Sequence, residues 1–169
     1  MVIISQHISI ECYTQYLINL QNERTTQLQW PDYYPEDCPP KDAITSSLTV
    51  YRLVKRDPAE TGDFIPLYIE KPENFVNKPA SEVCQGCGIS VLKDIQDVIN
   101  LQNISGKMRR KHIAEGHINQ MLGMTKHTPS RRYRSHHTWW VPNGIKPRSV
   151  FKVISEHKAN SNYKGIQNG

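Results

Sequence analysis

Apolar residues in this chain come in short runs separated by polar or proline-containing stretches, and this pattern limits the fold to a small core. Hydrophobic residues make up 37% of the 169 residues, and the mean hydropathy is −0.60. No stretch approaches the roughly 20 apolar residues that a membrane-spanning helix needs. The first 20 residues lack a basic leader, so a signal peptide is not expected. The sequence therefore predicts one soluble, cytoplasmic domain over 1–155 and a flexible polar tail over 156–169.

Three short runs rich in β-branched and aromatic residues predict strands. They are 48–54 (LTVYRLV), 137–141 (HTWWV) and 150–154 (VFKVI). The turn signal Asn143-Gly144 lies between the last two, which are therefore expected to pair antiparallel. A fourth run, 64–69, contains Pro66, which places this strand at a sheet edge or at a bulge.

Apolar residues at helical spacing predict helices over 9–22 and 90–102, the second capped by Ser90. The segment 105–117 fits either a short basic helix that ends at Gly116 or a hairpin that turns there. The remaining stretches are expected to be connections, of which the first is held by prolines and aromatic residues. They are 25–47, 71–89 and 123–135. The sequence therefore predicts an α+β fold: a small, mostly antiparallel sheet with two or three helices and long Pro-rich connections.

Charge is divided unevenly along the chain. Residues 1–98 hold 8 Lys and Arg against 14 Asp and Glu, a net of −6, whereas 99–169 hold 13 against 2, a net of +11. A positive field of this size favours RNA, DNA or a nucleotide as the partner. Two basic groups supply the expected phosphate contacts. They are Arg109, Arg110 and Lys111, and Arg131, Arg132 and Arg134.

The predicted strand that ends in two tryptophans combines groups that could carry chemistry. On a strand, His136, Thr138 and Trp140 share one face, and His137 and Trp139 share the other. A His beside a Thr can hold a phosphate oxygen and move a proton near neutral pH, and a Trp can stack on a base. His136, His137 and Thr138 are therefore the candidate catalytic residues, and the tryptophans are candidate stacking surfaces. The structural alternative is that one Trp fills the core while the other lies under the 30–40 loop or at a ligand groove.

Two short triplets resemble the paired motifs of the two-histidine phosphoesterase family. They are His7-Ile8-Ser9 and His136-His137-Thr138. The resemblance implies that the two histidines act as acid and base on a phosphodiester. The first triplet departs from the family pattern, because no strand and helix precede it.

Two cysteines and two histidines resemble a Cys2His2 zinc set. They are Cys84, Cys87, His112 and His117. Between Cys87 and His112 lie 24 residues, whereas the finger pattern has about 12, so a classical finger is excluded. An irregular zinc site remains as the alternative to small buried cysteines, and no other cofactor is expected. In a reducing compartment the four cysteines are expected to be thiols or metal ligands.

Arg52 lies inside the predicted strand 48–54, where a basic residue either pairs with a carboxylate or holds a substrate phosphate. No Gly-rich phosphate loop or Gly-x-Ser-x-Gly elbow is present, which disfavours ATP hydrolysis and serine-hydrolase chemistry. The sequence thus predicts a phosphate-engaging protein that binds nucleic acid through its basic C-terminal part. One alternative is a metal-independent enzyme that processes nucleotides or phosphodiesters with a histidine of the 136–140 strand. The other is a protein-interaction module whose acidic and basic parts neutralise each other.

Overall fold

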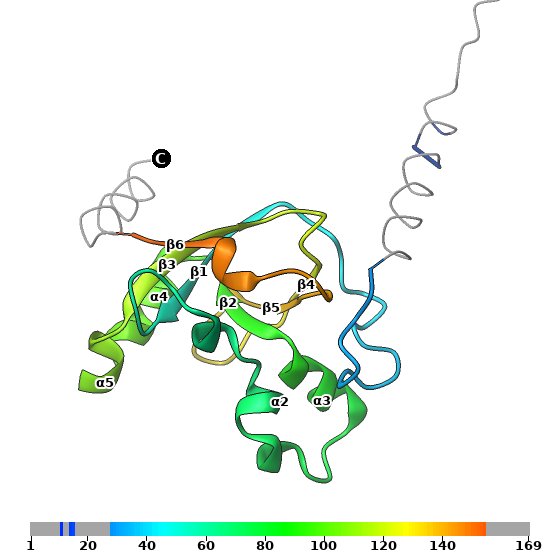
Figure 1. Ribbon diagram of the computed structural model, residues 1–169, viewed down its shortest axis with the longest axis horizontal. Coiled ribbons are helices and arrows are strands. Elements are labelled where there is room, and N and C mark those ends of the chain that lie inside the picture. Colours follow the sequence, from blue (N-terminus) through cyan, green and yellow to red (C-terminus); the bar gives the residue numbers. More distant parts are fainter. Residues whose placement is uncertain (1–10, 12–13, 16–27, 155–169) are drawn as a thin grey trace, which may run out of the picture.

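Six strands form one antiparallel sheet in the order β4-β5-β2-β1-β3-β6 (Figure 1). The structure is a computed structural model that describes Glu11, Thr14, Gln15 and residues 28–154. The strands are β1 (Leu48–Val54), β2 (Ile89–Leu92), β3 (His112–Ile118), β4 (Met124–His127), β5 (His136–Trp140) and β6 (Phe151–Val153). The helices are α2 (Leu67–Glu70), α3 (Ala80–Cys87), α4 (Ile95–Asn103) and α5 (Gly106–Arg109), with 3₁₀ turns at Thr61–Phe64, Pro72–Phe75 and Pro147–Ser149. The predicted α+β class with a small antiparallel sheet is confirmed.

Some predicted features fall on parts of the chain that are not described. The helix expected over 9–22 lies, apart from three residues, outside the described residues. The triplet His7-Ile8-Ser9 and the tail 156–169 also lie outside them. No helix in the described part is long and apolar enough to cross a membrane.

The sheet is joined unevenly at its centre. β1 pairs with β3 along its whole length, from Leu48 opposite Ile118 to Val54 opposite His112. Between β1 and β2, by contrast, the register holds a single pair, Tyr51 opposite Leu92. Beyond that pair, backbone groups of β2 are left for side chains to bond, and this is where the candidate site lies.

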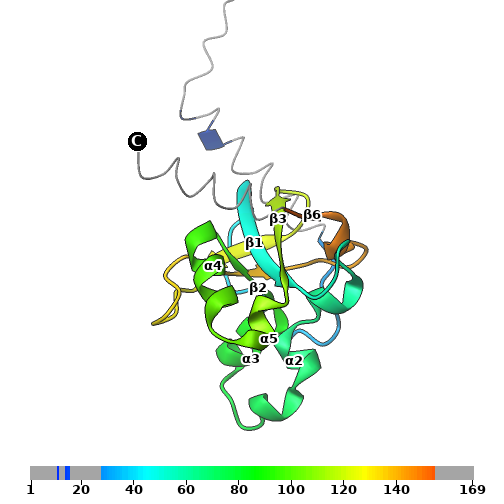
Figure 2. The same cartoon turned by 90° about the vertical axis from the view of Figure 1, so that its left-hand side faces the viewer.

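Each face of the sheet carries its own part of the core. On one face, residues of β1, β2 and β5 pack against Phe64 and Phe151, whose ring centroids are 5.0 Å apart. On the other face, Tyr51 and Leu53 lie against α4, which runs beside β1 (Figure 2). Further along that face, Trp140 is covered by the 30–40 loop.

Two expected connections contain regular structure instead. The 71–89 stretch includes α3 and leads into β2, and the 123–135 stretch includes β4. β2 also takes the start of the helix expected over 90–102, so α4 begins after Asp94 rather than Ser90. The Asp94 carboxylate accepts the Gln96 N–H at 2.8 Å, which makes Asp94 the N-cap.

Three further expectations are corrected. The 64–69 run is not a strand: Phe64 turns into the core and α2 follows directly on Pro66. The 105–117 segment is neither one helix nor a hairpin, since α5 is followed by β3 and Gly116 lies inside the strand. A Cβ at Gly116 would lie 2.8 Å from the Phe151 ring, so this glycine makes room for the ring. β5 and β6 are strands as predicted but do not pair, because β5 lies between β4 and β2 while β6 pairs with β3.

Candidate phosphate-binding site

A cavity of about 170 Å³ opens where β1 and β2 separate. We call it the Arg52 pocket. Six of the residues that line it carry the argument: Arg52, Ser90, Met108, Lys111, Tyr133 and His136. They come from β1, β2, α5 and the segment after it, the loop before β5, and β5 itself. Arg52, the first basic group through Lys111, and the 136–140 strand through His136 are separate features in the sequence, and all three reach this one cavity.

Arg52 is held rigidly but not by a carboxylate. Its Nε donates to the carbonyl of Asp63 at 2.8 Å, and Nη1 donates to the carbonyl of Ser90. The Asp63 carboxylate is occupied by the N–H groups of Lys55 and Glu60, at 2.7 and 3.0 Å. The expected carboxylate pairing is therefore not made among the described residues, and Nη2 has no hydrogen-bond partner there.

The Arg52 guanidinium keeps its positive charge at neutral pH. Burial lowers its pKa to about 10, with Asp63 and Glu70 opposing the change as nearby negative charges. A half-buried cation that bonds only to carbonyls is partly desolvated and lacks a counter-ion in contact. Such a group favours an anion, and a guanidinium fits phosphate oxygens particularly well.

Lys111 adds a second cation to the same cavity. Its pKa is lowered, first by burial and then by the positive charges of Lys55, Arg52 and Lys107. These lysines and Arg52 therefore lie close enough to repel one another. An anion in the pocket would relieve that repulsion.

The hydroxyl of Tyr133 is an unsatisfied polar group on a residue of the pocket wall. It is the single buried side-chain oxygen or nitrogen without a hydrogen-bond partner in the described part of the chain. Buried polar groups nearly always have a partner, so an orphan needs an explanation. Tyr133 lines the Arg52 pocket while its hydroxyl is itself buried, so a shift of the ring would be needed for a ligand oxygen in the pocket to supply the missing bond.

One ring nitrogen of His136, Nε2, is available to accept a hydrogen bond or a proton. Its Nδ1 lies 2.9 Å from the carbonyl oxygen of Thr128 and 3.0 Å from the Oγ1 of the same residue. A carbonyl only accepts, so Nδ1 carries the hydrogen and Nε2 carries the lone pair in the neutral ring. Nε2 has no hydrogen-bond partner among the described residues. Burial is the largest cause that lowers the pKa of His136, so the ring is neutral at pH 7 and can accept a proton.

The other two candidate catalytic residues have different positions. Thr138 is buried, and its Oγ1 lies 2.9 Å from the Oγ1 of Thr128, so it can only position His136 indirectly. His137 lies on the opposite face of the sheet, where its Nδ1 donates to the carbonyl of Ser135 at 2.9 Å and its ring packs on His127. Of these three residues, only His136 lines the Arg52 pocket.

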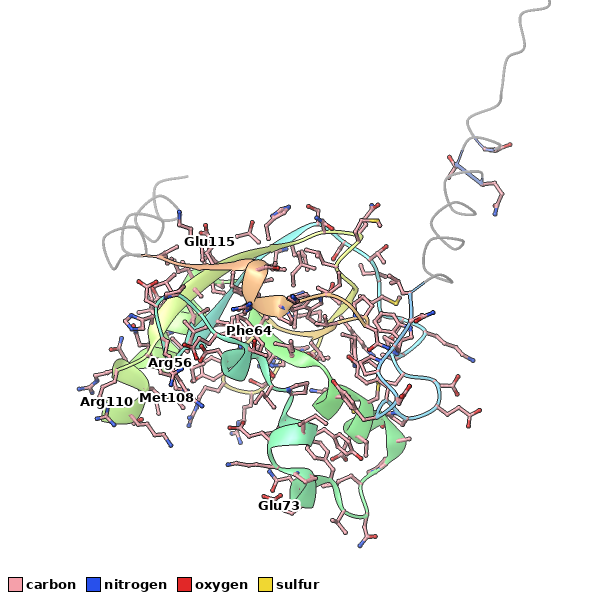
Figure 3. All side chains as sticks on the ribbon, in the orientation of Figure 1. Arg56, Phe64, Glu73, Met108, Arg110 and Glu115 are labelled. Carbon is pink, nitrogen blue, oxygen red and sulfur yellow. A yellow bond between two sulfur atoms is a disulfide. The ribbon has the colours of Figure 1, made fainter. Side chains whose placement is uncertain are left out.

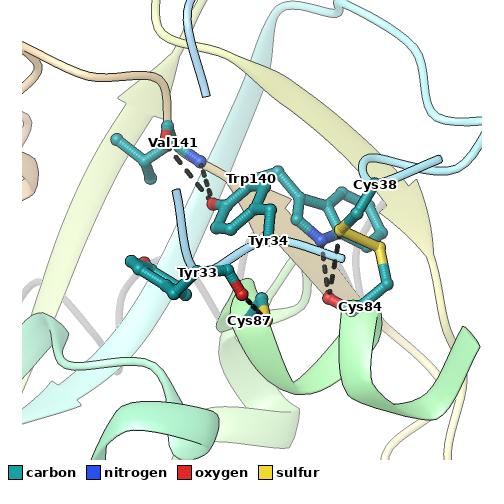
Figure 4. The surroundings of a disulfide bond; sticks show 7 residues. All are labelled: Tyr33, Tyr34, Cys38, Cys84, Cys87, Trp140 and Val141. Carbon is teal, nitrogen blue, oxygen red and sulfur yellow. Dashed lines mark hydrogen bonds between the residues drawn. A yellow bond between two sulfur atoms is a disulfide. The ribbon is translucent and has the colours of Figure 1, made fainter. Parts of the chain in front are cut away.

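The two tryptophans are structural. Trp139 is 0% exposed and its Nε1 donates to the carbonyl of Leu122 at 2.9 Å. Trp140 is 1% exposed, and its Nε1 donates to the carbonyl of Cys84 at 2.8 Å (Figure 4). One ring thus fills the core and the other lies under the 30–40 loop. Neither has a free face for a base, so the base-stacking role expected for them is corrected to a packing role.

The two basic groups flank the Arg52 pocket. Met108 and Tyr133 pack against the same hydrophobic cluster under α4, which brings α5 and the 131–134 loop together. Figure 3 labels Met108 on α5 and Arg110 directly after that helix. The arginines of both groups are exposed: Arg109, Arg110, Arg131, Arg132 and Arg134. None of them takes part in the three ion pairs of the described part, of which only Lys126–Asp42 joins the acidic and basic parts of the chain.

The zinc set is not brought together. Cys84 forms a disulfide with Cys38, with an S–S distance of 2.06 Å, which also corrects the expectation that these two cysteines are thiols or metal ligands. Cys87 is a buried free thiol. His112 and His117 lie five residues apart on β3 and so point to opposite faces of the sheet. The described residues contain no group of three or more His, Cys, Asp or Glu that could hold a metal ion.

Sequence reasoning missed Tyr133 and Ser90. Tyr133 interrupts a run of arginines in a polar loop, and an aromatic residue among basic ones was the signal available for it. The sequence predicts Ser90 as a helix cap, but it lies in β2 and supplies the carbonyl that holds Arg52. Comparison with protein-family models, with curated proteins and with solved structures finds no match for this chain, so the functional argument depends on the geometry of this site.

The lowered pKa of His136 predicts how stability depends on pH. The unfolded chain has an ordinary histidine pKa of about 6.5, so below that pH it binds more protons than the folded chain. The free energy of unfolding should therefore fall as the pH is lowered through that range. His136→Gln should reduce this dependence without removing it, because the pKa of His137 is lowered as well. Melting temperatures between about pH 7.5 and 5 test this, with the exposed His112→Gln as the control. An unchanged slope in His136→Gln would contradict the assignment.

Proposed function

We propose that this chain binds phosphate-bearing ligands and that one phosphate group occupies the Arg52 pocket. The observation that carries the proposal is the convergence on one cavity of a partly desolvated Arg52 with Lys111 and with Tyr133, whose hydroxyl has no hydrogen-bond partner among the described residues. Two cations and a donor around a small cavity match the charge and the acceptor oxygens of a phosphate. His136, whose Nε2 has no hydrogen-bond partner among the described residues, lines the same cavity, which makes this histidine the candidate for metal-independent acid–base chemistry on a bound phosphate ester.

A nucleotide is the ligand that the pocket favours. The cations face a cavity of about 170 Å³, which suits a single phosphate group better than a continuous backbone. A nucleic acid is the second candidate, because the exposed arginines of the two basic groups lie beside the same cavity and could contact successive phosphates.

A cytoplasmic location stays a prediction, and the Cys38–Cys84 disulfide weighs against it, since disulfides are typical of oxidising compartments.

Arg52→Met tests the phosphate proposal. It should weaken binding of inorganic phosphate and of adenosine monophosphate by about tenfold or more, because a charge-assisted hydrogen bond is worth roughly 1.5–3 kcal/mol. Isothermal titration calorimetry at low salt measures both affinities. Arg56→Met is the matched control, since Arg56 is exposed and pairs with Glu60 away from the pocket.

A second set of variants separates the two ligand classes. Reversing Arg131 and Arg132 to Glu should weaken binding of single-stranded RNA or DNA and reduce its salt dependence, while the affinity for the mononucleotide changes less. If the unmodified protein binds neither phosphate, nor nucleotide, nor either polymer at low salt, the proposed function is wrong.

A further inference from the structure

A second cavity lies directly beside the Arg52 pocket. Its volume is about 380 Å³, and it shares Ser90 and His136 with the Arg52 pocket. We call it the α3 cavity, because α3 forms one wall, while α2 and the 128–130 segment contribute to the others. Since two residues line both cavities, the cavities adjoin at Ser90 and His136.

Glycines form part of the α3 wall for steric reasons. A Cβ at Gly86 would lie 2.3 Å from the Phe75 ring, and a Cβ at Gly88 would lie 2.3 Å from Cγ2 of Thr138. Side chains cannot be accommodated at these positions without displacing Phe75 or Thr138. The side chains of Phe75 and Thr138 occupy the space above these glycines, so the wall around α3 is closely packed.

The two cavities differ in charge. The Arg52 pocket contains Arg52 and Lys111, whereas no Lys or Arg is among the described residues that line the α3 cavity. Its walls combine apolar groups with an amide and hydroxyls: Leu67, Phe75, Pro129, Gln85, Thr128 and Ser130. Its one carboxylate, Glu82, is paired with Lys78 at 3.1 Å. The α3 cavity therefore suits an uncharged body with flat apolar faces and a hydrogen-bonding edge.

We propose that the α3 cavity holds the nucleoside of a nucleoside monophosphate whose phosphate group lies in the Arg52 pocket. This inference rests on the proposed function, to which it adds the class and the orientation of the ligand. Because no Lys or Arg is among the described residues that line the α3 cavity, a mononucleotide fits the two cavities better than an internal unit of a strand, whose second phosphate would lack a cation there. His136, at the junction of the cavities, then faces the ribose with Nε2 free to accept a hydroxyl proton.

Two substitutions in the α3 cavity test the proposal while the phosphate site is left intact. Leu67→Ser removes an apolar wall group, and Gln85→Trp fills the cavity from an exposed position on α3. Ile69→Ser is the matched control: Ile69 lies on the same short helix as Leu67, both are 47% exposed, and only Leu67 lines the cavity. Because all three residues are exposed, stability should change little, which circular dichroism and melting temperatures check.

Calorimetry with two probes, inorganic phosphate and adenosine monophosphate, gives the readout. The unmodified protein should bind the mononucleotide about tenfold or more tightly than phosphate. Gln85→Trp should abolish that difference in affinity and Leu67→Ser should reduce it. Ile69→Ser should leave the difference unchanged. The phosphate affinity should stay unchanged in all three variants. If phosphate binds in an Arg52-dependent manner but the mononucleotide binds no more tightly, or if the cavity variants do not weaken it, the inference is wrong and the phosphate proposal stands. If neither probe binds, both are wrong.

Discussion

Replacing Trp140 by Ala should lower the free energy of unfolding by about 3–5 kcal/mol, as expected for a large aromatic residue lost from a core. The ring is 1% exposed, lies between Cys84 and the 30–40 loop, and donates its indole N–H to the carbonyl of Cys84 (Figure 4). The substitution leaves a cavity and an unpartnered carbonyl in the buried seam between α3 and β5. Urea denaturation followed by circular dichroism measures the loss.

Stability and phosphate affinity, measured on the same variants, separate a packing role of Trp140 from a ligand-stacking role. A Trp that stacked on a base would lose ligand affinity on substitution while stability changed little, whereas Trp140→Phe should retain phosphate affinity and lose stability. Met121→Ala serves as the control, because Met121 is 64% exposed and its loss should cost no more than about 0.5 kcal/mol. A Trp140→Ala variant as stable as the unmodified protein would contradict the packing role.

The local sequence was sufficient to predict an element where its residues fit only one type of secondary structure. The 48–54 run is bounded as predicted because it is branched, aromatic and free of proline, so no other element competes for it. β2 was missed because Val91 and Leu92 fit both a four-residue strand and the start of a helical stripe, and the helical period was preferred. β5 and β6 were found as strands, but their partners are β2, β4 and β3, which no turn signal near Asn143 could indicate.

For the candidate site too, the sequence indicates the individual residues but not how they come together. Arg52, Lys111 and His136 were each identified by residue type, yet nothing in their spacing predicts that they line one cavity. That convergence depends on long-range contacts: the pairing of His136 with Leu92, and the packing of Met108 and Tyr133 under α4. The burial of both tryptophans depends on the 30–40 loop and on α3 in the same way.

Removing the Cys38–Cys84 disulfide should lower the free energy of unfolding by about 2–4 kcal/mol. The bond joins residues separated by 46 positions, so it greatly restricts the unfolded chain. It also fixes the 30–40 loop on α3, where that loop covers Trp140 (Figure 4). The double variant Cys38→Ala, Cys84→Ala avoids an unpaired thiol, and its urea midpoint should shift downward, as should that of the unmodified protein in a reducing agent. This bond is not expected from the sequence, because in a reducing compartment the four cysteines are predicted to be thiols or metal ligands.

Two comparisons show whether the disulfide acts through stability alone. Cys87→Ala is the matched control, because it removes a buried cysteine from α3 and leaves the disulfide in place. It should cost less than the double variant and make no difference to the effect of reduction. Phosphate affinity should remain near that of the unmodified protein in the double variant, since the disulfide joins the 30–40 loop to α3, whereas Arg52, Lys111 and Tyr133 lie on β1, directly after α5 and in the loop before β5. Equal stability in the oxidised and reduced states would mean that the chain folds without this bond, and lost phosphate affinity would mean that the loop helps to form the Arg52 pocket.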